Sequence, residues 1–351
     1  MEGYLWFVIS EAKPRAPRIL IARFSALGDI VTMQPVVTAM RRKFGEDAVL
    51  DLVCLSRCAE AAKLLSEINQ VHLVERGTGE VLEALRERNF DYLMDFHGTV
   101  RSRSLARSLD VLTFSVDKQA WNRWRLIRGF RNASVTGFIE RCFQCLQPFD
   151  IEPPSKELRG ADAWGNLNLP EHQDKAELTS GQVVVSLGSS HPGKHLSNAI
   201  VDTAIHAAEQ SSRRVVLVGG HAEQPRAEML AERHDHVLSR AGQWSLGESA
   251  LAIRHADAVV SGDTVTMHLA AAVGTPLATV WGCTRPSLGL SAWRPNLQSL
   301  DLTPRDNPSR PCSKHGATCR HTRSSDPFHP DRCAQQVSAD DLAKWMLKVL
   351  K

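Results

Sequence analysis

At 351 residues the chain is too long for one compact core, so we expect two domains. With 43% hydrophobic and 23% charged residues the composition is that of a globular protein, and a net charge of +3 does not by itself indicate nucleic-acid binding. The eight cysteines lack the spacing of a secreted disulfide framework, and no apolar run reaches the roughly 18 residues of a membrane span. We therefore expect a cytoplasmic protein with reduced thiols.

The amino-terminal half alternates short apolar runs with amphipathic segments. Residues 18–23 indicate a buried strand, residues 24–29 a loop that contains a glycine, and residues 30–44 an amphipathic helix. Asp29 ends the loop, where an aspartate commonly caps the helix that follows. Further strands are predicted at residues 49–55 and 71–74, helices at 59–65 and 81–88, and a strand, polar turn and helix at 91–102. This alternation is typical of a Rossmann-like domain.

The segment between residues 101 and 141 is rich in arginine and contains Trp121 and Trp124. Three interpretations fit it: RNA binding, binding of a phosphorylated ligand anchored in a membrane, or a solvated face with two packing tryptophans. Nucleic acid is the weakest of the three, because no recognised RNA-binding motif accompanies the charge.

A proline-rich stretch at residues 148–180 predicts the linker between the two domains. After it the alternation of strands and helices starts again. The predicted elements are a strand at 182–187, a loop with Lys194 at 188–195, a strand and turn at 214–223, a helix at 247–254 and a closing helix at 338–350. The lysine loop does not have the spacing of a Walker A motif. We expect Ser338 to be the N-cap of the closing helix.

The strongest chemical signal lies at residues 257–276. A buried strand at 258–260 leads into a polar turn at 261–264 and then into a helix of small residues at about 266–273, which Gly274 ends. Such a turn, at the carboxyl end of a parallel strand and the amino terminus of a helix, is where open α/β sheets bind phosphates. Free backbone N–H groups and the helix dipole both point at the ligand there.

Metal and nucleophile sites find less support. Cys142 and Cys145 have C-x-x-C spacing but lie in a predicted helix, with no second pair at finger spacing. A later group contains three cysteines with histidines nearby: Cys312, Cys319, Cys333, His315, His321 and His329. We expect no metal at the catalytic site and leave a structural metal at the later group open. The sequence has no G-x-S-x-G elbow for a hydrolase and no D-x-D at a strand end for a metal-dependent transferase.

The stretch SGDTVTMHLAAAVGTP at residues 261–276 resembles the donor-site signature of family 9 glycosyltransferases, the bacterial heptosyltransferases of lipopolysaccharide synthesis. Val265 stands where the family usually has glycine. RFSALGDIV at residues 23–31 resembles the opening motif of the family. The resemblance implies the GT-B fold, an α/β architecture of two Rossmann-like α/β/α domains that face each other across a cleft. It implies an acceptor domain at residues 1–165, a nucleotide-sugar domain at 166–336, and a final helix at 337–351 that packs back toward the first domain.

The resemblance also implies a reaction and the residues that carry it. The reaction is transfer of heptose from ADP-heptose to the lipopolysaccharide inner core or a related cell-surface saccharide, with inversion and without metal or cofactor. Asp29 would be the general base, and Lys194 would meet the donor diphosphate. The expected donor-binding residues are Ser189, Lys194, Gly220, Glu223, Trp244, Asp263, Thr264, Val265, Thr266, Met267 and His268. The expected acceptor-binding residues are Ser25, Gly28, His97, Arg101, Arg123 and Arg125. The implied partners are a lipid-linked anionic saccharide and the cytoplasmic face of the inner membrane, with no nucleic acid.

Each assignment has a simpler alternative. Asp29 could only cap a helix, His97 could only bond the backbone of its turn, Lys194 could be a solvent-exposed lysine, and Trp244 could pack under a loop. For the whole protein, one alternative keeps the fold and uses another nucleotide sugar, such as a UDP-hexose or UDP-hexosamine. The other is a degenerate protein that binds a nucleotide sugar without catalysis, which Val265 motivates.

Overall fold

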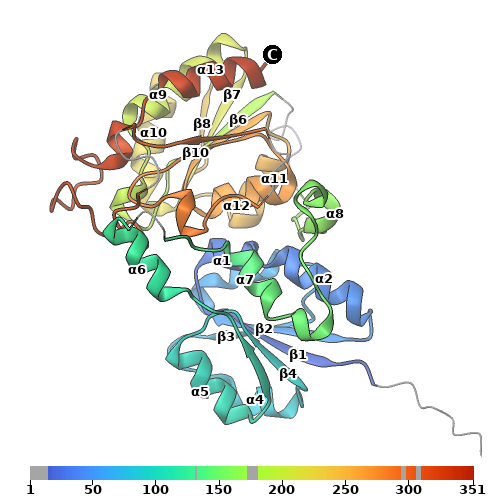
Figure 1. The fold of residues 1–351 in the computed structure, drawn as a ribbon. Helices are drawn as coiled ribbons and strands as arrows, with labels where there is room; N and C mark the ends of the chain where they lie inside the picture. Colours follow the sequence, from blue (N-terminus) through green and yellow to red (C-terminus); the bar gives the residue numbers. More distant parts are fainter. Residues whose placement is uncertain (1–14, 131–132, 172–180, 294–297, 306–309) are drawn as a thin grey trace, which may run out of the picture.

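The computed structural model describes residues 15–130, 133–171, 181–293, 298–305 and 310–351, and it contains two parallel β-sheets (Figure 1). Each sheet belongs to its own α/β domain. Helices cover both faces of each sheet, so each domain has three layers. Among the described residues no helix is long and apolar enough to cross a lipid bilayer.

The amino-terminal sheet has the strand order β3-β2-β1-β4-β5. Its strands are β1 (Arg18–Ala22), β2 (Val49–Leu55), β3 (Gln70–Val74), β4 (Tyr92–Asp95) and β5 (Leu112–Ser115). The helices of this half are α1 (Leu27–Val31), α2 (Gln34–Phe44), α3 (Ala59–Lys63), α4 (Leu82–Glu87), α5 (Val100–Leu109), α6 (Ala120–Arg128), α7 (Phe138–Gln144) and α8 (Ala161–Trp164). Ile19 and Ile21 of β1 belong to one apolar core, and Leu20 and Ala22 belong to the core on the opposite face. A strand buried on both sides is expected to show this alternation.

The carboxyl-terminal sheet has the strand order β11-β10-β9-β6-β7-β8. Its strands are β6 (Gln182–Ser186), β7 (Arg214–Val218), β8 (Val237–Ser239), β9 (Ala258–Gly262), β10 (Leu277–Val280) and β11 (Ser299–Leu302). Its helices are α9 (Asn198–Gln210), α10 (Gln224–Arg233), α11 (Leu246–Arg254), α12 (Val265–Val273) and α13 (Asp340–Val349). Both strand orders are those of doubly wound Rossmann-like sheets, which confirms the expected architecture. The expected boundary at residue 165 lies between β5 and β6, and residues 172–180 of the expected linker lie outside the described residues.

The two domains meet through α1 of the first and α12 of the second, which lie side by side between the sheets in Figure 1. One apolar core runs across this contact and includes Ile30 of α1 and Met267 of α12. Trp164 in α8 is fully buried and donates a hydrogen bond from Nε1 to the backbone oxygen of Trp293, at 3.0 Å. The domain contact therefore fixes the loops at the facing ends of the two sheets.

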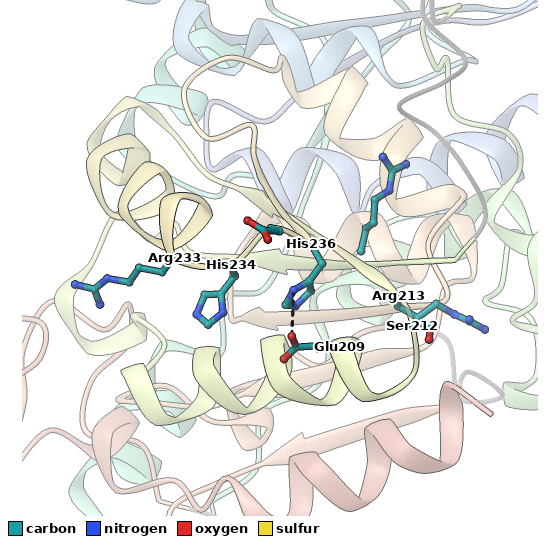
Figure 2. Close-up of a pocket in the computed structure, with 8 residues that line it drawn as sticks. Glu209, Ser212, Arg213, Arg233, His234 and His236 are labelled. Carbon is teal, nitrogen blue, oxygen red and sulfur yellow. Dashed lines mark ion pairs between the residues drawn. The ribbon is translucent and has the colours of Figure 1, made fainter.

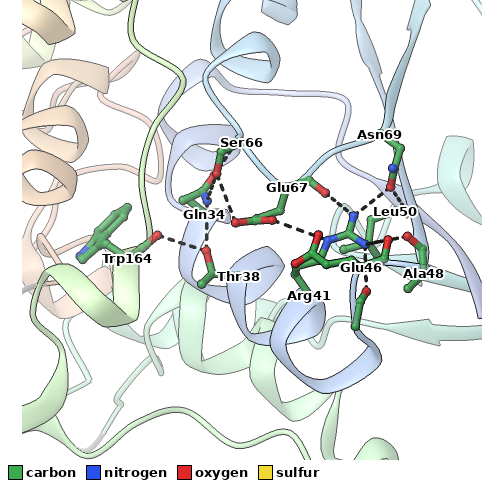
Figure 3. Close-up of polar contacts among 11 residues, drawn as sticks. Gln34, Thr38, Arg41, Glu46, Ala48, Leu50, Ser66, Glu67, Asn69 and Trp164 are labelled. Carbon is green, nitrogen blue, oxygen red and sulfur yellow. Dashed lines mark hydrogen bonds and ion pairs between the residues drawn. The ribbon is translucent and has the colours of Figure 1, made fainter. Parts of the chain in front are cut away.

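Figure 3 shows how α2 is attached to its sheet. The buried guanidinium of Arg41 donates hydrogen bonds to the backbone oxygen of Ala48 at 2.6 Å and to Asn69 Oδ1 at 2.9 Å. Thr38 Oγ1 donates to the backbone oxygen of Trp164 at 3.3 Å. Hydrogen bonds from a charged group to buried oxygens are strong, so Arg41 fixes α2 to the segments before β2 and β3. Thr38 fixes α2 to α8.

Three local predictions were wrong. Residues 30–44 are not one helix: α1 ends at Val31 and α2 starts at Gln34, because Pro35 lacks an N–H and favours a new helix start. The final helix α13 does not pack toward the first domain. Its Leu342 and Met346 lie in the core of the second domain, where α13 contacts α9 and β11.

Ser338 is not the N-cap of α13, because the helix starts at Asp340 and its N-cap is Ala339. Ser338 Oγ still accepts a hydrogen bond from the Asp340 N–H at 3.4 Å.

Candidate active site

The residues that carry the expected chemistry follow the carboxyl ends of four strands. The segment from Arg23 to Asp29 follows β1, and His97 follows β4, its neighbour in the first sheet. Lys194 follows β6, and Asp263 follows β9, its neighbour in the second sheet. In each sheet this pair of strands is the place where the strand order reverses, which is where open α/β sheets bind ligands.

Asp29 is the third residue of α1, and its carboxylate has two partners. Oδ2 forms an ion pair with the guanidinium of Arg23 and accepts a hydrogen bond from the Ala26 N–H at 3.2 Å. Burial raises the pKa of Asp29, but Arg23, the Ala26 N–H and His268 lower the pKa more, and the net shift is downward. Asp29 is therefore ionised at neutral pH, as a general base must be before it accepts a proton. The simpler reading also holds in part, because Asp29 caps α1 from inside its first turn.

Lys194 ends a short 3₁₀ helix (Pro192–Lys194) and points at the turn after β9. Its Nζ forms an ion pair with Asp263 Oδ2 at 2.7 Å, but the angles do not fit a hydrogen bond. The same Nζ donates a hydrogen bond to the Asp263 backbone oxygen at 3.0 Å. The two side chains are only 15% and 6% exposed. Lys194 is thus a fixed, nearly buried cation beside the first turn of α12, not a solvent-exposed lysine.

The first turn of α12 faces α1 directly. A Cβ atom added to Gly28 would lie 2.7 Å from His268 Cδ2, so with any other residue at this position the His268 ring would have to shift. Burial lowers the pKa of His268, against the opposite influence of Asp263 and Asp29, so the ring is neutral at pH 7. Its Nδ1 is buried without a hydrogen-bond partner among the described residues. A buried polar atom without a partner at such a place is suited to a ligand.

Three expected acceptor residues line one hollow of about 600 Å³ in the first domain: Ser25, His97 and Arg101. Burial lowers the pKa of His97 to about 4, with Arg23 and Lys118 adding to the shift. Its ring packs edge-on against Phe24 at a centroid distance of 5.3 Å, and its backbone N–H donates to Asp95 Oδ1 at 3.0 Å. His97 therefore both bonds its own turn and presents a neutral imidazole to the hollow.

Cations gather around Asp29 from segments far apart in the sequence. Burial lowers the pKa of Arg123, and Arg141 lowers it further, while Asp29 raises it. The pKa of Lys314 is lowered by burial and by Arg123, and again Asp29 raises it. Buried positive groups that lower one another's pKa favour the binding of an anion. Of these cations, Arg123 was predicted to bind the acceptor, Arg141 lies in the same arginine-rich segment but was not singled out, and no local pattern marks Lys314.

Other predicted residues have structural partners of their own. The side chain of Met267 is fully buried in the shared apolar core, so the expected contact of this residue with the donor would be made by its backbone N–H. Thr266 Oγ1 donates to Ser186 Oγ at 3.0 Å, and both residues are buried. Thr264 Oγ1 lies 3.0 Å from Ser261 Oγ at the entrance of α12, and Val265 starts the helix.

The remaining donor predictions surround the second sheet. Glu223 Oε2 accepts from the Gly220 N–H at 2.9 Å, so the carboxylate caps its own turn. Trp244 packs against the shared core, with the Arg240 guanidinium 5.7 Å from its ring centroid. Ser189 Oγ donates to the backbone oxygen of His191 at 3.0 Å in the lysine loop. These contacts organise the turns, and donor binding by the three side chains stays a prediction.

On the acceptor side, Arg125 lies on α6 with its guanidinium 5.6 Å from the centroid of the Phe130 ring. It does not line the hollow with Ser25, His97 and Arg101.

A second hollow of about 470 Å³ lies away from this site (Figure 2). Arg213 precedes β7 and His236 precedes β8, so the hollow is at the amino ends of the strands. His236 Nδ1 lies 3.9 Å from Glu209 Oε1 there. Ligand sites of doubly wound sheets lie at the opposite edge, so we assign no role in the reaction to this hollow.

The model of glycosyltransferase family 9 (heptosyltransferase) matches residues 79–317, more than half of the chain. The chain belongs to this family. The protein is therefore a glycosyltransferase with two Rossmann-like domains, and the resemblance found in its motifs is confirmed.

Solved structures of similar glycosyltransferases have the same fold. A family 9 glycosyl transferase from Veillonella parvula matches with a TM-score of 0.69 and 14% identity, over 96% of this chain and 98% of its own. The Escherichia coli heptosyltransferase WaaC with ADP matches with a TM-score of 0.67 and 20% identity, over 95% and 99%. The E. coli ADP-heptose lipopolysaccharide heptosyltransferase II matches with a TM-score of 0.62 and 15% identity, over 95% and 98%. No curated protein sequence matches the chain.

Proposed function

We propose that this family 9 glycosyltransferase transfers heptose from ADP-heptose to a lipid-linked anionic saccharide of the lipopolysaccharide inner core, with inversion and without a catalytic metal. The observation that carries the proposal is the packing of α1, which contains Asp29, against the first turn of α12, beside which Lys194 is held by its ion pair with Asp263. The similar WaaC has been solved with ADP and with ADP-2-deoxy-2-fluoro heptose, which supports ADP-heptose as the donor.

The proposed reaction is a single displacement at the anomeric carbon of the donor. The acceptor hydroxyl attacks this carbon from the amino-terminal side while Asp29 takes its proton, so one C–O bond forms as the bond to the diphosphate breaks. Both partners of the Asp29 carboxylate bind Oδ2, so Oδ1 is the oxygen that we assign to the acceptor hydroxyl. Arg23 fixes the orientation of the carboxylate.

The charge that develops on the leaving ADP needs stabilisation on the other side of the cleft. Lys194 and the free backbone N–H groups in the first turn of α12 supply it. Asp263, which lies beside Lys194, would bind hydroxyl groups of the sugar. Closure of the domains around the donor would exclude water and so favour transfer over hydrolysis.

The acceptor is proposed to be anionic because of the cations around Asp29. Lys118, Arg123 and Lys314 all have pKa values lowered by burial and by one another's charge or that of Arg23. An acceptor with carboxylate or phosphate groups would relieve this repulsion and gain long-range attraction.

Helix α6 is the proposed contact with the membrane surface on its cytoplasmic face. Trp121 is 67% exposed, Trp124 44% and Phe130 49%, and the two tryptophan rings stack at a centroid distance of 4.9 Å. The Arg128 guanidinium lies 5.5 Å from the centroid of Trp124. Exposed aromatic rings with arginines suit the interface of an anionic bilayer. Trp121→Ser with Trp124→Ser should weaken binding to anionic vesicles at least tenfold, while Leu158→Ser, another exposed apolar residue, should not.

The function is tested with purified enzyme, lipopolysaccharide from a heptose-deficient strain, and three donors: ADP-heptose, UDP-glucose and UDP-N-acetylglucosamine. Mass spectrometry of the acceptor measures the sugar that is added. We expect the mass gain of one heptose, at a rate at least 100-fold above that with either UDP-sugar. A faster reaction with a UDP-sugar would overturn ADP-heptose as the donor, and tight ADP binding without transfer would overturn the proposed reaction with this acceptor.

A further inference from the structure

Four cysteines that are distant in the sequence come together beside the lysine loop. Cys283 follows β10, Cys312 and Cys319 lie between β11 and a 3₁₀ helix (Cys333–Gln336), and Cys333 starts that helix. The sulfur atoms of Cys283, Cys312 and Cys319 all lie within 4.8 Å of one another. Those of Cys312 and Cys333 are 3.5 Å apart, and a ring nitrogen of His321 lies within 4.8 Å of both.

These separations fit a metal site better than disulfides. A disulfide needs two sulfur atoms at about 2.05 Å, and all eight cysteines are free. Four thiolates around a tetrahedral zinc ion at about 2.3 Å are about 3.8 Å apart, which is the spacing that the Cys312–Cys333 pair approaches.

We propose that Cys283, Cys312, Cys319 and Cys333 bind one structural metal ion through their thiolates, with zinc as the expected metal. Thiolates in tetrahedral arrangement bind zinc and iron, and zinc needs no redox partner. His321 lies in reach as a replacement ligand for one cysteine. Such a site is distinct from the catalytic chemistry, which stays metal-independent.

The segment that carries Cys312 and Cys319 is hydrogen-bonded to the loop that contains Lys194. The Cys283 N–H donates to the Gly193 backbone oxygen at 2.8 Å, and the Gly193 N–H donates to that of Gly316 at 3.0 Å. The Cys312 N–H donates to the Cys283 oxygen at 2.8 Å. A Cβ atom on Gly193 would lie 2.5 Å from the Cys283 sulfur, so the packing at this junction is close.

The same segment brings two charged or titratable groups to the cleft. Burial lowers the pKa of His315 to about 4, and Lys314 and Lys194 add to the shift. Lys314 in turn feels the charges of Arg123 and Asp29. The metal ion would therefore fix both Lys194 and Lys314 at the ligand site. This consequence rests on the proposed function, whereas metal binding itself does not.

The test measures metal content by inductively coupled plasma mass spectrometry on protein purified without chelators and with zinc and iron in the medium. We expect about one metal ion per chain, and a loss of at least fivefold in Cys312→Ser and in Cys333→Ser. Cys145→Ser is the matched control, because its hydroxyl can keep the bond that the Cys145 thiol makes to the Arg141 oxygen, and it should retain the metal. Zinc and iron both support the thiolate site, and the measurement distinguishes them.

A second readout covers variants that fail to fold. In the wild-type protein, cobalt substitution should give the thiolate-to-cobalt charge-transfer absorption of a tetrahedral site, and four thiols should become reactive only after a chelator removes the metal. Metal below about 0.1 ion per chain, or intact-mass detection of a Cys312–Cys333 disulfide in the native protein, would overturn the proposal. Neither result depends on transferase activity, so the failure of this site and that of the proposed function can be told apart.

Discussion

The ion pair between Lys194 and Asp263 makes a quantitative prediction. In Lys194→Met the Asp263 carboxylate, only 6% exposed, loses the cation 2.7 Å away. Breaking one side of a buried pair costs about 3–5 kcal/mol, and since Lys194 is 15% exposed we expect the lower end, about 3 kcal/mol. For a domain of this size about 1 kcal/mol corresponds to roughly 2–4 °C, so the melting temperature should fall by roughly 6–12 °C.

The double variant Lys194→Met with Asp263→Asn separates the structural role from the catalytic one. Because no unpaired charge remains, most of the lost stability should return. Transfer should stay at least about 100-fold below the wild type, since the cation for the leaving diphosphate is still missing. Differential scanning calorimetry and the ADP-heptose transfer assay measure the two effects on the same samples.

The control is Arg213→Met, which breaks the Arg213–Asp257 pair at 2.6 Å on the opposite edge of the same domain. Its partners are 30% and 31% exposed, so the expected loss is about 1 kcal/mol or less. If the double variant regained transfer, Lys194 would serve only to neutralise Asp263, and our reasoning on the leaving group would be refuted.

Two further predictions concern the amino-terminal domain. Gly28→Ala places a Cβ atom 2.7 Å from His268 Cδ2, so the His268 ring or the contact between α1 and α12 must shift. We expect kcat to fall at least tenfold with the ADP affinity little changed. An unchanged kcat would show that this contact is not part of the active state. The pKa of His97 is about 4 in the folded protein against an ordinary value of 6.5, so the unfolded chain takes up the proton first and stability falls as the pH drops from about 6.5 to about 4. For a half-buried ring the loss of folding free energy over this pH range is about 1–2 kcal/mol. Urea unfolding curves of His97→Gln should not show it. If the stability of the variant and of the wild type depended on pH in the same way, the lowered pKa of His97 would be contradicted.

The sequence was sufficient to predict the features that depend on local patterns. Apolar runs located the strands that place Asp29 and Lys194, because a turn after a parallel strand always lies at the same edge of its sheet. The small residues after Asp263 predicted α12 to within one residue at its start. These elements could be found because their signal is contained in adjacent residues.

The features that were missed depend on contacts between distant segments. Cys283 gave no signal of its own, because its partner Cys312 belongs to a later segment that only the fold brings near. Lys314 likewise reaches the surroundings of Asp29 from the second domain. The break before α2 was the exception, since Pro35 marked it locally.

The most direct test of the account is Asp29→Asn, measured for both ADP binding and heptose transfer. The amide keeps the size of the side chain but cannot take the proton of the acceptor hydroxyl. Calorimetric titration should give an ADP dissociation constant within threefold of the wild type, while transfer should fall by a factor of about 100 or more. Transfer within tenfold of the wild type, with ADP binding intact, would contradict the role of Asp29 as the base and with it the proposed mechanism.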